Sequence, residues 1–292
     1  MPSVRRRPRP FAAVLLLQGL LVAAAPAFAG EAEAPPLDVP YVSTPQPVVE
    51  KMLEMARVTK DDVVYDLGSG DGRIVITAAK KYGARGVGVD IDPERIRESN
   101  ENARKAGVEH LVRFVQQNLF DTDLREATVV TMYLLQAVNL RLRPRLLAQL
   151  DPGDRIVSHA FDLGDWRPDR TAEVETGDGR RVYVYAWVVP ANVGGDWELT
   201  FRDGDAERRL RLAFEQRFQR VRGQAQLDGR AVRVESVRLT GDRIAFAVRD
   251  DAGGRPRTLR FVGRVEGDRM VAAVPGERNG PPRSGRGGPP VA

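Results

Sequence analysis

A glycine-rich turn flanked by acidic residues is the part of the sequence best suited to bind a ligand. The stretch Asp66-Leu67-Gly68-Ser69-Gly70-Asp71-Gly72 follows an apolar run and precedes a helical pattern. Glycines let the backbone turn tightly and approach a ligand without an intervening Cβ atom. The free amides at the start of the next helix favour anionic groups. Such a loop could hold a dinucleotide, a phosphate or an amino-acid carboxylate.

The spacing of the glycines and the position of a second acid narrow this choice. The spacing is G-x-G-x-G and not the G-x-G-x-x-G of dinucleotide-binding enzymes, and the loop lacks the lysine of a P-loop. Asp90 ends the next apolar run in GVGVDIDP, where it could accept hydrogen bonds from ribose hydroxyls. Together these features resemble the class I S-adenosylmethionine-dependent methyltransferases. A glycine turn in an ordinary α/β domain is the alternative interpretation.

A closer resemblance covers residues 39–170. The runs VPYVSTPQPVVEKMLEMA and VVTMYLLQAVNLRLRPRLLAQLDPGDRIVSHAFDLGDW are similar to the seven-stranded lysine methyltransferases of mitochondrial ATP synthase subunit c and the adenine nucleotide translocase, and to bacterial relatives. The resemblance implies that S-adenosylmethionine is the cofactor and that Tyr41 and Thr44 close over its methionine end. It also implies the residues that hold the rest of the cofactor, which are Asp66, Gly68, Gly70, Asp90 and Asn118.

The methyl acceptor is expected beside the residues that follow the fourth strand of the fold. Methyl transfer from a sulfonium needs a nucleophile held close and in line. Candidate catalytic residues are Thr131 and Tyr133, with Gln136 beside them. Tyr133 could orient a lysine amine, and a packed tyrosine at a strand end is the alternative. His159 could act as a base or make a structural hydrogen bond.

Residues 41–190 are expected to form an α/β domain, which positions the candidate site residues. Short apolar runs alternate with helical patterns, which is typical of a doubly wound, Rossmann-like sheet of the class I methyltransferase type. The expected strands are 62–67, 86–91, 112–117, 127–134, 155–161 and 181–189. The last of these follows a TGDGR turn, which an antiparallel edge strand would explain. The expected helices are Pro47–Arg57, Arg73–Tyr82, Pro93–Ala106 and Asn139–Leu150.

A second, all-β domain is expected over residues 191–275. Turn signals such as LDGR, TGDR and EGDR recur between runs of alternating apolar and charged residues. This pattern predicts a small antiparallel domain, either an open sheet or a small barrel. The remaining residues, 276–292, are rich in glycine and proline and are expected to form a disordered tail.

The first thirty residues predict export. Four arginines precede the apolar run Phe11–Ala25, and Ala27-Phe28-Ala29 follows as a cleavage pattern, so residues 1–29 read as a signal peptide. An uncleaved membrane anchor is the alternative. In either case this segment would engage the membrane or export machinery and place the protein outside the cytoplasm. Residues 30–40 are expected to be a linker.

Charge and composition exclude several classes of protein. The net charge of +5 falls to +1 without the four arginines of the leader, so we expect no nucleic-acid partner. There is no cysteine, and the two histidines are far apart, so we expect neither disulfides nor a metal site.

The sequence thus predicts a methyltransferase whose acceptor is a protein lysine. Because S-adenosylmethionine has no evident supply outside the cytoplasm, a non-catalytic exported scaffold on the same fold is the alternative. A nicotinamide-dependent enzyme is disfavoured by the glycine spacing.

Overall fold

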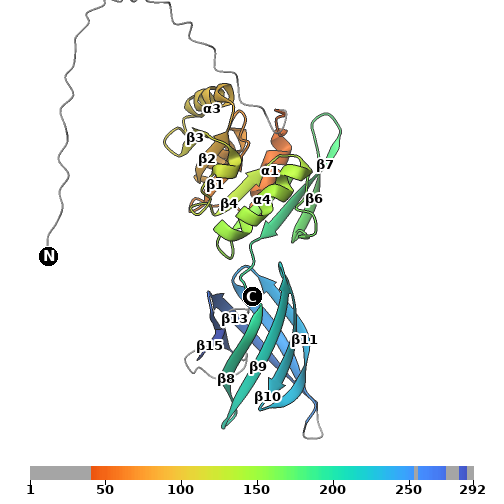
Figure 1. Ribbon diagram of the computed structural model, residues 1–292. Helices are drawn as coiled ribbons and strands as arrows, with labels where there is room; N and C mark the ends of the chain where they lie inside the picture. Colours follow the sequence, from red (N-terminus) through yellow and green to blue (C-terminus); the bar gives the residue numbers. More distant parts are fainter. Residues whose placement is uncertain (1–40, 253–255, 274–282, 288–292) are drawn as a thin grey trace, which may run out of the picture. The chain divides into compact units, whose positions relative to one another are not determined.

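The computed structural model describes residues 41–252, 256–273 and 283–287 (Figure 1). The predicted signal peptide and linker lie outside these residues. Within the described part of the chain, no helix is both long and apolar enough to cross a membrane.

The first domain is a seven-stranded sheet with the strand order β3-β2-β1-β4-β5-β7-β6. The first five strands in this order are parallel, and β7 runs antiparallel to both of its neighbours, β5 and β6. This confirms the predicted class I methyltransferase fold. The strands are β1 Val63–Leu67, β2 Arg85–Asp90, β3 Val112–Gln116, β4 Val129–Met132, β5 Arg155–His159, β6 Arg170–Glu175 and β7 Arg181–Val188; the helices are α1 Gln46–Ala56, α2 Arg73–Tyr82, α3 Pro93–Ala106 and α4 Gln136–Gln149, with a 3-10 turn η1 at Leu119–Asp121.

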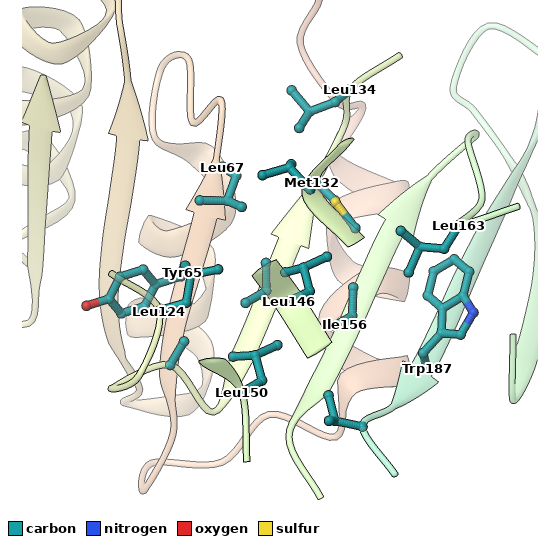
Figure 2. Packing of buried hydrophobic residues seen from close by; sticks show 14 of the residues in the cluster. Tyr65, Leu67, Leu124, Met132, Leu134, Leu146, Leu150, Ile156, Leu163 and Trp187 are labelled. Atoms are coloured by element: carbon teal, nitrogen blue, oxygen red, sulfur yellow. The ribbon is translucent and has the colours of Figure 1, made fainter. Parts of the chain in front are cut away.

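Apolar side chains are buried on both faces of this sheet, which is why its central strands read as continuous apolar runs. Tyr65 and Leu67 of β1 belong to the cluster that contains Leu146 of α4 (Figure 2). Val64, which directly precedes Tyr65 in β1, points to the other face and joins the cluster that contains Met52 of α1. The sheet is therefore held from both sides, and the ends of its strands are fixed in position.

One expectation about the sheet edge is wrong. The strand predicted near residues 181–189 is antiparallel, as expected, but it lies between β5 and β6 and is not an edge. The edge is β6, which the sequence analysis missed. Its residues are mostly exposed and polar, so it shows no apolar run, and it is recognisable only by its pairing with β7.

The second domain is a closed antiparallel barrel with the order β10-β11-β12-β13-β14-β15-β8-β9. Alternate residues point inward, and Trp197, Leu212, Phe246 and Phe261 are part of one buried cluster. The strands are β8 Gly195–Asp203, β9 Ala206–Arg217, β10 Arg220–Leu227, β11 Arg230–Thr240, β12 Arg243–Asp250, β13 Arg257–Glu266, β14 Arg269–Ala273 and β15 Arg283–Gly287.

The predicted disordered tail contains the strand that closes this barrel. Residues Arg283–Gly287 form β15, which pairs with β14 on one side and with β8 on the other. The prediction of disorder is therefore wrong for this segment. Backbone hydrogen bonds do not require apolar side chains, so a glycine- and arginine-rich segment can complete a sheet when two open edges face it.

Candidate active site

Two cavities adjoin at the carboxyl ends of the central parallel strands. They share four lining residues, which are Tyr41, Val42, Gly68 and Tyr133. Parallel α/β sheets bind ligands at this edge, where loops from neighbouring strands come together. We refer to the two cavities as the Asp90 cavity and the Asp66 cavity, after the acidic residue that lines each.

The Asp90 cavity combines an acidic group with apolar walls. Asp90, at the end of β2, accepts hydrogen bonds from the backbone amides of Gly70 (2.8 Å) and Asp92 (3.0 Å), which fix its carboxylate. Asn118 also lines this cavity, and its Oδ1 accepts a hydrogen bond of 2.9 Å from the amide of Phe120. Each of these oxygens keeps a second lone pair for a ligand donor. The remaining walls are formed by residues including Ile91, Leu119 and Leu134.

The Asp66 cavity contains an acid that is almost completely buried. The Asp66 side chain lies at the end of β1 and is only 2 % exposed. Burial, with smaller contributions from the charges of Asp90 and Asp71, raises its pKa to about 7, and a hydrogen bond from Thr131 opposes this shift. Ser69 lines the same cavity, and its buried Oγ has no hydrogen-bond partner among the described residues. Both groups are available to a polar ligand.

Glycine is required in the loop between these two acids. Gly68 and Gly70 have φ values of +76° and +53°, which side-chain-bearing residues rarely adopt. A Cβ on Gly68 would lie 2.9 Å from Leu134 Cδ2, and one on Gly70 would lie 2.3 Å from Tyr41 Cε2. The backbone therefore lines the space directly, as the sequence predicted.

Residues 41–45 lie against this loop and are held by two arginines. Arg73 donates a 3.0 Å hydrogen bond to the carbonyl of Thr44 and is paired with Asp71 at 2.6 Å. Burial acts to raise the pKa of Asp71, but the hydrogen bonds and charge of Arg73 outweigh it and lower that pKa. The guanidinium of Arg95 lies 4.9 Å from the centre of the Tyr41 ring. Tyr41 nevertheless remains 45 % exposed.

Tyr133 lies where the two cavities adjoin, and its ring packs against two other aromatic rings. Its ring centre lies 3.8 Å from that of His159 and 6.5 Å from that of Phe161. His159 is 2 % exposed, its Nδ1 lies 3.3 Å from Thr44 Oγ1, and its Nε2 has no partner among the described residues. Burial lowers the pKa of His159 to about 4, so the ring is neutral near pH 7. It lines neither cavity.

The structure brings together most of the residues predicted for the site. All seven predicted cofactor residues line one or both cavities or their glycine loop, and Tyr133 lies beside them: Tyr41, Thr44, Asp66, Gly68, Gly70, Asp90 and Asn118. Gln136 points elsewhere and donates a 2.6 Å hydrogen bond to Asp162.

Thr131 is the predicted catalytic residue that the structure removes from the cavity surface. Its side chain is 0 % exposed and donates a 2.7 Å hydrogen bond to Asp66 Oδ1. Thr131 and Asp66 are directly opposite each other in the β1–β4 ladder, which explains the contact. It therefore positions Asp66 and touches no ligand.

Sequence reasoning missed several lining residues. Asp71, Arg73, Asp92 and Arg95 were not proposed, although Asp71 belongs to the quoted glycine loop. Charged residues at helix starts give no distinct sequence signal, because most of them are solvated. In the described part of the chain, no cluster of residues could hold a metal ion.

The fold and the two cavities define a class I S-adenosylmethionine-dependent methyltransferase. Comparison with known proteins agrees. Residues 66–170 match the family model described as the ANTKMT methyltransferase domain. The chain is 52 % identical over 149 residues to a protein-lysine N-methyltransferase of Saccharolobus islandicus, covering 50 % of this chain and 92 % of that protein. The chain belongs to this methyltransferase family, and its cofactor is S-adenosylmethionine.

Two further relatives differ in how much of their length the chain covers. The mouse adenine nucleotide translocase lysine N-methyltransferase is 36 % identical over 150 residues, which are 51 % of this chain and 63 % of that protein. A crystal structure described as an RNA methyltransferase from Salinibacter ruber, in complex with S-adenosyl-L-homocysteine, is 55 % identical with a TM-score of 0.50. That match covers 52 % of this chain and 96 % of the Salinibacter chain. The non-catalytic alternative finds no support in these comparisons.

Proposed function

We propose that the protein transfers the methyl group of S-adenosylmethionine to the side-chain amine of a lysine in a protein. The observation that carries this proposal is the pair of acid-lined cavities that adjoin at Tyr133. The names of the Saccharolobus and mouse relatives support lysine as the acceptor. The name of the Salinibacter structure supports a different acceptor, so the acceptor is what the experiment must decide.

Each cavity suits one part of the cofactor. Asp90 and Asn118 would accept hydrogen bonds from the ribose hydroxyls and the adenine amine in the Asp90 cavity. Asp66 would pair with the ammonium of the methionine part in the other cavity, and Tyr41 and Thr44 would cover it. The sulfonium between these two parts makes the methyl group electrophilic. Gly68 lines both cavities, so the backbone can pass close to this junction.

Tyr133 is the proposed catalytic residue because it lies where the methyl group must be presented. In the transfer, a bond forms between the lysine nitrogen and the methyl carbon, while the carbon–sulfur bond breaks and its electrons stay on sulfur. The lysine must release its ammonium proton to water before this attack, so that the nitrogen lone pair is free. The side chain of Tyr133 would hold the amine in line with the methyl group, which is the positioning that such a transfer requires.

A labelling experiment tests both the reaction and the acceptor. Protein beginning at residue 30 is incubated with methyl-labelled S-adenosylmethionine and a cell extract, either treated with nuclease or treated with protease. We expect label in protein that survives nuclease and yields methyllysine on hydrolysis. Label confined to nuclease-sensitive material would refute the lysine acceptor.

Two substitutions connect the activity to the site. Asp90→Ala should weaken S-adenosylmethionine binding by about 1–3 kcal/mol through lost hydrogen bonds to a charged group. Asp123→Ala is the matched control, because Asp123 is exposed, pairs only with the neighbouring Arg125 and lines neither cavity. Calorimetric titration with S-adenosylmethionine should separate the two variants. Equal affinities would refute the assignment of Asp90.

We further propose that the protein works outside the cytoplasm. The arginine cluster, the apolar run Phe11–Ala25 and the small-x-small pattern at 27–29 support this proposal. Fractionation of cells that produce the full chain, with N-terminal sequencing of the product, tests it. A cytoplasmic product that retains Met1 would refute it.

A further inference from the structure

The two domains have net charges of opposite sign, although the chain without its leader is nearly neutral. Residues 30–190 contain 21 basic and 26 acidic residues, a net charge of −5. Residues 191–292 contain 20 basic and 14 acidic residues, a net charge of +6, and every basic residue there is an arginine. A charge asymmetry of this size within one chain points to an anionic partner for the basic part.

Three of these arginines lie close together on one outer face of the barrel. On the outer face of β11, β12 and β13, Arg238 is opposite Ala245, and Ala245 is opposite Val262. In the next outward-facing row, Ala247 stands between Ser236 and Arg260.

A third row, two residues along in the other direction, completes the face. Thr240 is opposite Arg243, and Arg243 is opposite Arg264. We call this surface the arginine face, defined by Arg238, Arg243 and Arg260 around Ala245 and Val262.

The three arginines of this face are free to bind a partner. All are exposed, and none has an ion pair or hydrogen bond within the described residues. Most barrel arginines outside the face differ, for example Arg208, which is paired with Asp203 and Asp228. Arg243 also stands directly opposite Arg264, and like charges in that position destabilise a sheet. Stability of the barrel alone does not account for this arrangement.

The centre of the arginine face is aliphatic. Val262 is 55 % exposed, and it is the one large hydrophobic side chain so exposed on the described part of the barrel. Of the two neighbouring alanines, Ala245 is half-buried and Ala247 is buried, so Val262 supplies most of the exposed apolar surface. No aromatic side chain points outward in these rows, so the face lacks the stacking platforms with which sheets bind single-stranded nucleic acids.

We propose that the arginine face docks on a membrane surface that contains anionic phospholipids. Arginines around a small aliphatic centre match the two components of interfacial binding, which are attraction to phosphate groups and shallow burial of apolar surface. The guanidinium group is suited to phosphate because it donates two parallel hydrogen bonds. The predicted leader brings the chain to a membrane, which supports lipid over other anions. This proposal does not depend on the identity of the methyl acceptor.

Vesicle sedimentation tests the proposal on protein beginning at residue 30, so that the leader cannot contribute. We expect binding to phosphatidylcholine vesicles that contain about 30 mol% phosphatidylglycerol, and little binding to phosphatidylcholine alone. The triple variant R238Q/R243Q/R260Q should bind about 100-fold more weakly, since each arginine near such a surface contributes a factor of about five. Binding should also weaken as salt is raised.

A second triple variant provides the matched control. R202Q/R209Q/R211Q removes the same charge from β8 and β9, and β8 lies opposite β12 in the barrel order. It should retain binding within about threefold of the unsubstituted protein, because its arginines face away from the membrane. Equal losses in the two triples would overturn the proposal. Competition by an oligonucleotide that binds more tightly than the vesicles would overturn it in favour of a nucleic-acid partner.

Discussion

Near and above neutral pH, the Asp66 carboxylate is charged and is expected to bind the cofactor. The same buried charge is expected to reduce the stability of the cofactor-free protein. The pKa of its carboxyl group is raised from 3.8 to about 7, chiefly by burial. A group whose pKa is higher in the folded state favours folding when it is protonated. Its folded-state penalty is therefore absent below about pH 4, grows as the pH rises and is complete above about pH 7. Three pKa units correspond to about 4 kcal/mol.

Asp66→Asn should therefore stabilise the cofactor-free protein above neutral pH. Asparagine carries no charge at any pH, and its carbonyl can still accept the hydrogen bond that Thr131 donates to Asp66. The new amide donors need partners, which costs about 1–2 kcal/mol where they find none. The expected gain in the free energy of unfolding is roughly 2–3 kcal/mol near pH 8. Near pH 4 the charge penalty is absent and the cost of the amide remains, so the gain should turn into a loss of about 1–2 kcal/mol.

Thermal unfolding at two pH values measures this effect. The α/β domain should gain about 4–12 °C in Tm near pH 8, given 2–4 °C per kcal/mol for a domain of this size. Asp123→Asn is the control: it is exposed, and the hydrogen bonds from Arg125 lower its pKa to about 2, so it should give no such gain. In parallel, Asp66→Asn should lose most of its affinity for S-adenosylmethionine. A variant that is destabilised equally near pH 8 and pH 4 would refute the assignment of a buried, costly charge.

Substitutions at three further positions probe the same site. Thr131→Val removes the hydrogen bond that stabilises the Asp66 carboxylate. Calorimetry near pH 7 should show about 10–100-fold weaker S-adenosylmethionine binding, and binding should recover near pH 9. A loss of affinity that is independent of pH would contradict this role. Gly70→Ala forces a Cβ to within 2.3 Å of Tyr41 at a φ of +53°, so cofactor affinity should fall at least about tenfold by calorimetry. Tyr133→Ala should lower the single-turnover methylation rate far more than cofactor affinity, whereas Tyr133→Phe keeps the stacking on His159 and should retain more activity.

Local features of the sequence were sufficient to predict the cofactor side of the site. The glycine spacing depends on backbone conformations that few other residues adopt, so Gly68 and Gly70 mark the turn directly. Asp66 and Asp90 follow apolar strands, and parallel strands bring their carboxyl ends to one edge of the sheet. These inferences need only the chain within a few residues of each position.

The role of Thr131 could not be predicted in this way, because it depends on strand register. The sequence places Thr131 beside Tyr133, and both therefore look like acceptor residues. In the sheet, Thr131 still belongs to β4 and is opposite Asp66, 65 residues earlier, whereas Tyr133 lies beyond the strand end and reaches the cavities. The end of β4 at Met132 therefore separates the buried Thr131 from Tyr133, which lines both cavities.

The same reasoning applies to the electrostatics of the barrel. A total charge averages over residues that the fold separates, so the near-zero sum said nothing about Arg238, Arg243 or Arg260. Arg238 and Arg243 lie on either side of one hairpin turn and Arg260 lies on the next strand, so the three are gathered on one face by the pairing of β11 with β12 and of β12 with β13. Their acidic neighbours pair with other arginines, as Glu235 does with Arg249 and Asp242 with Arg264. A surface charge that could bind a partner therefore follows from register and ion pairing together, and neither can be obtained from composition.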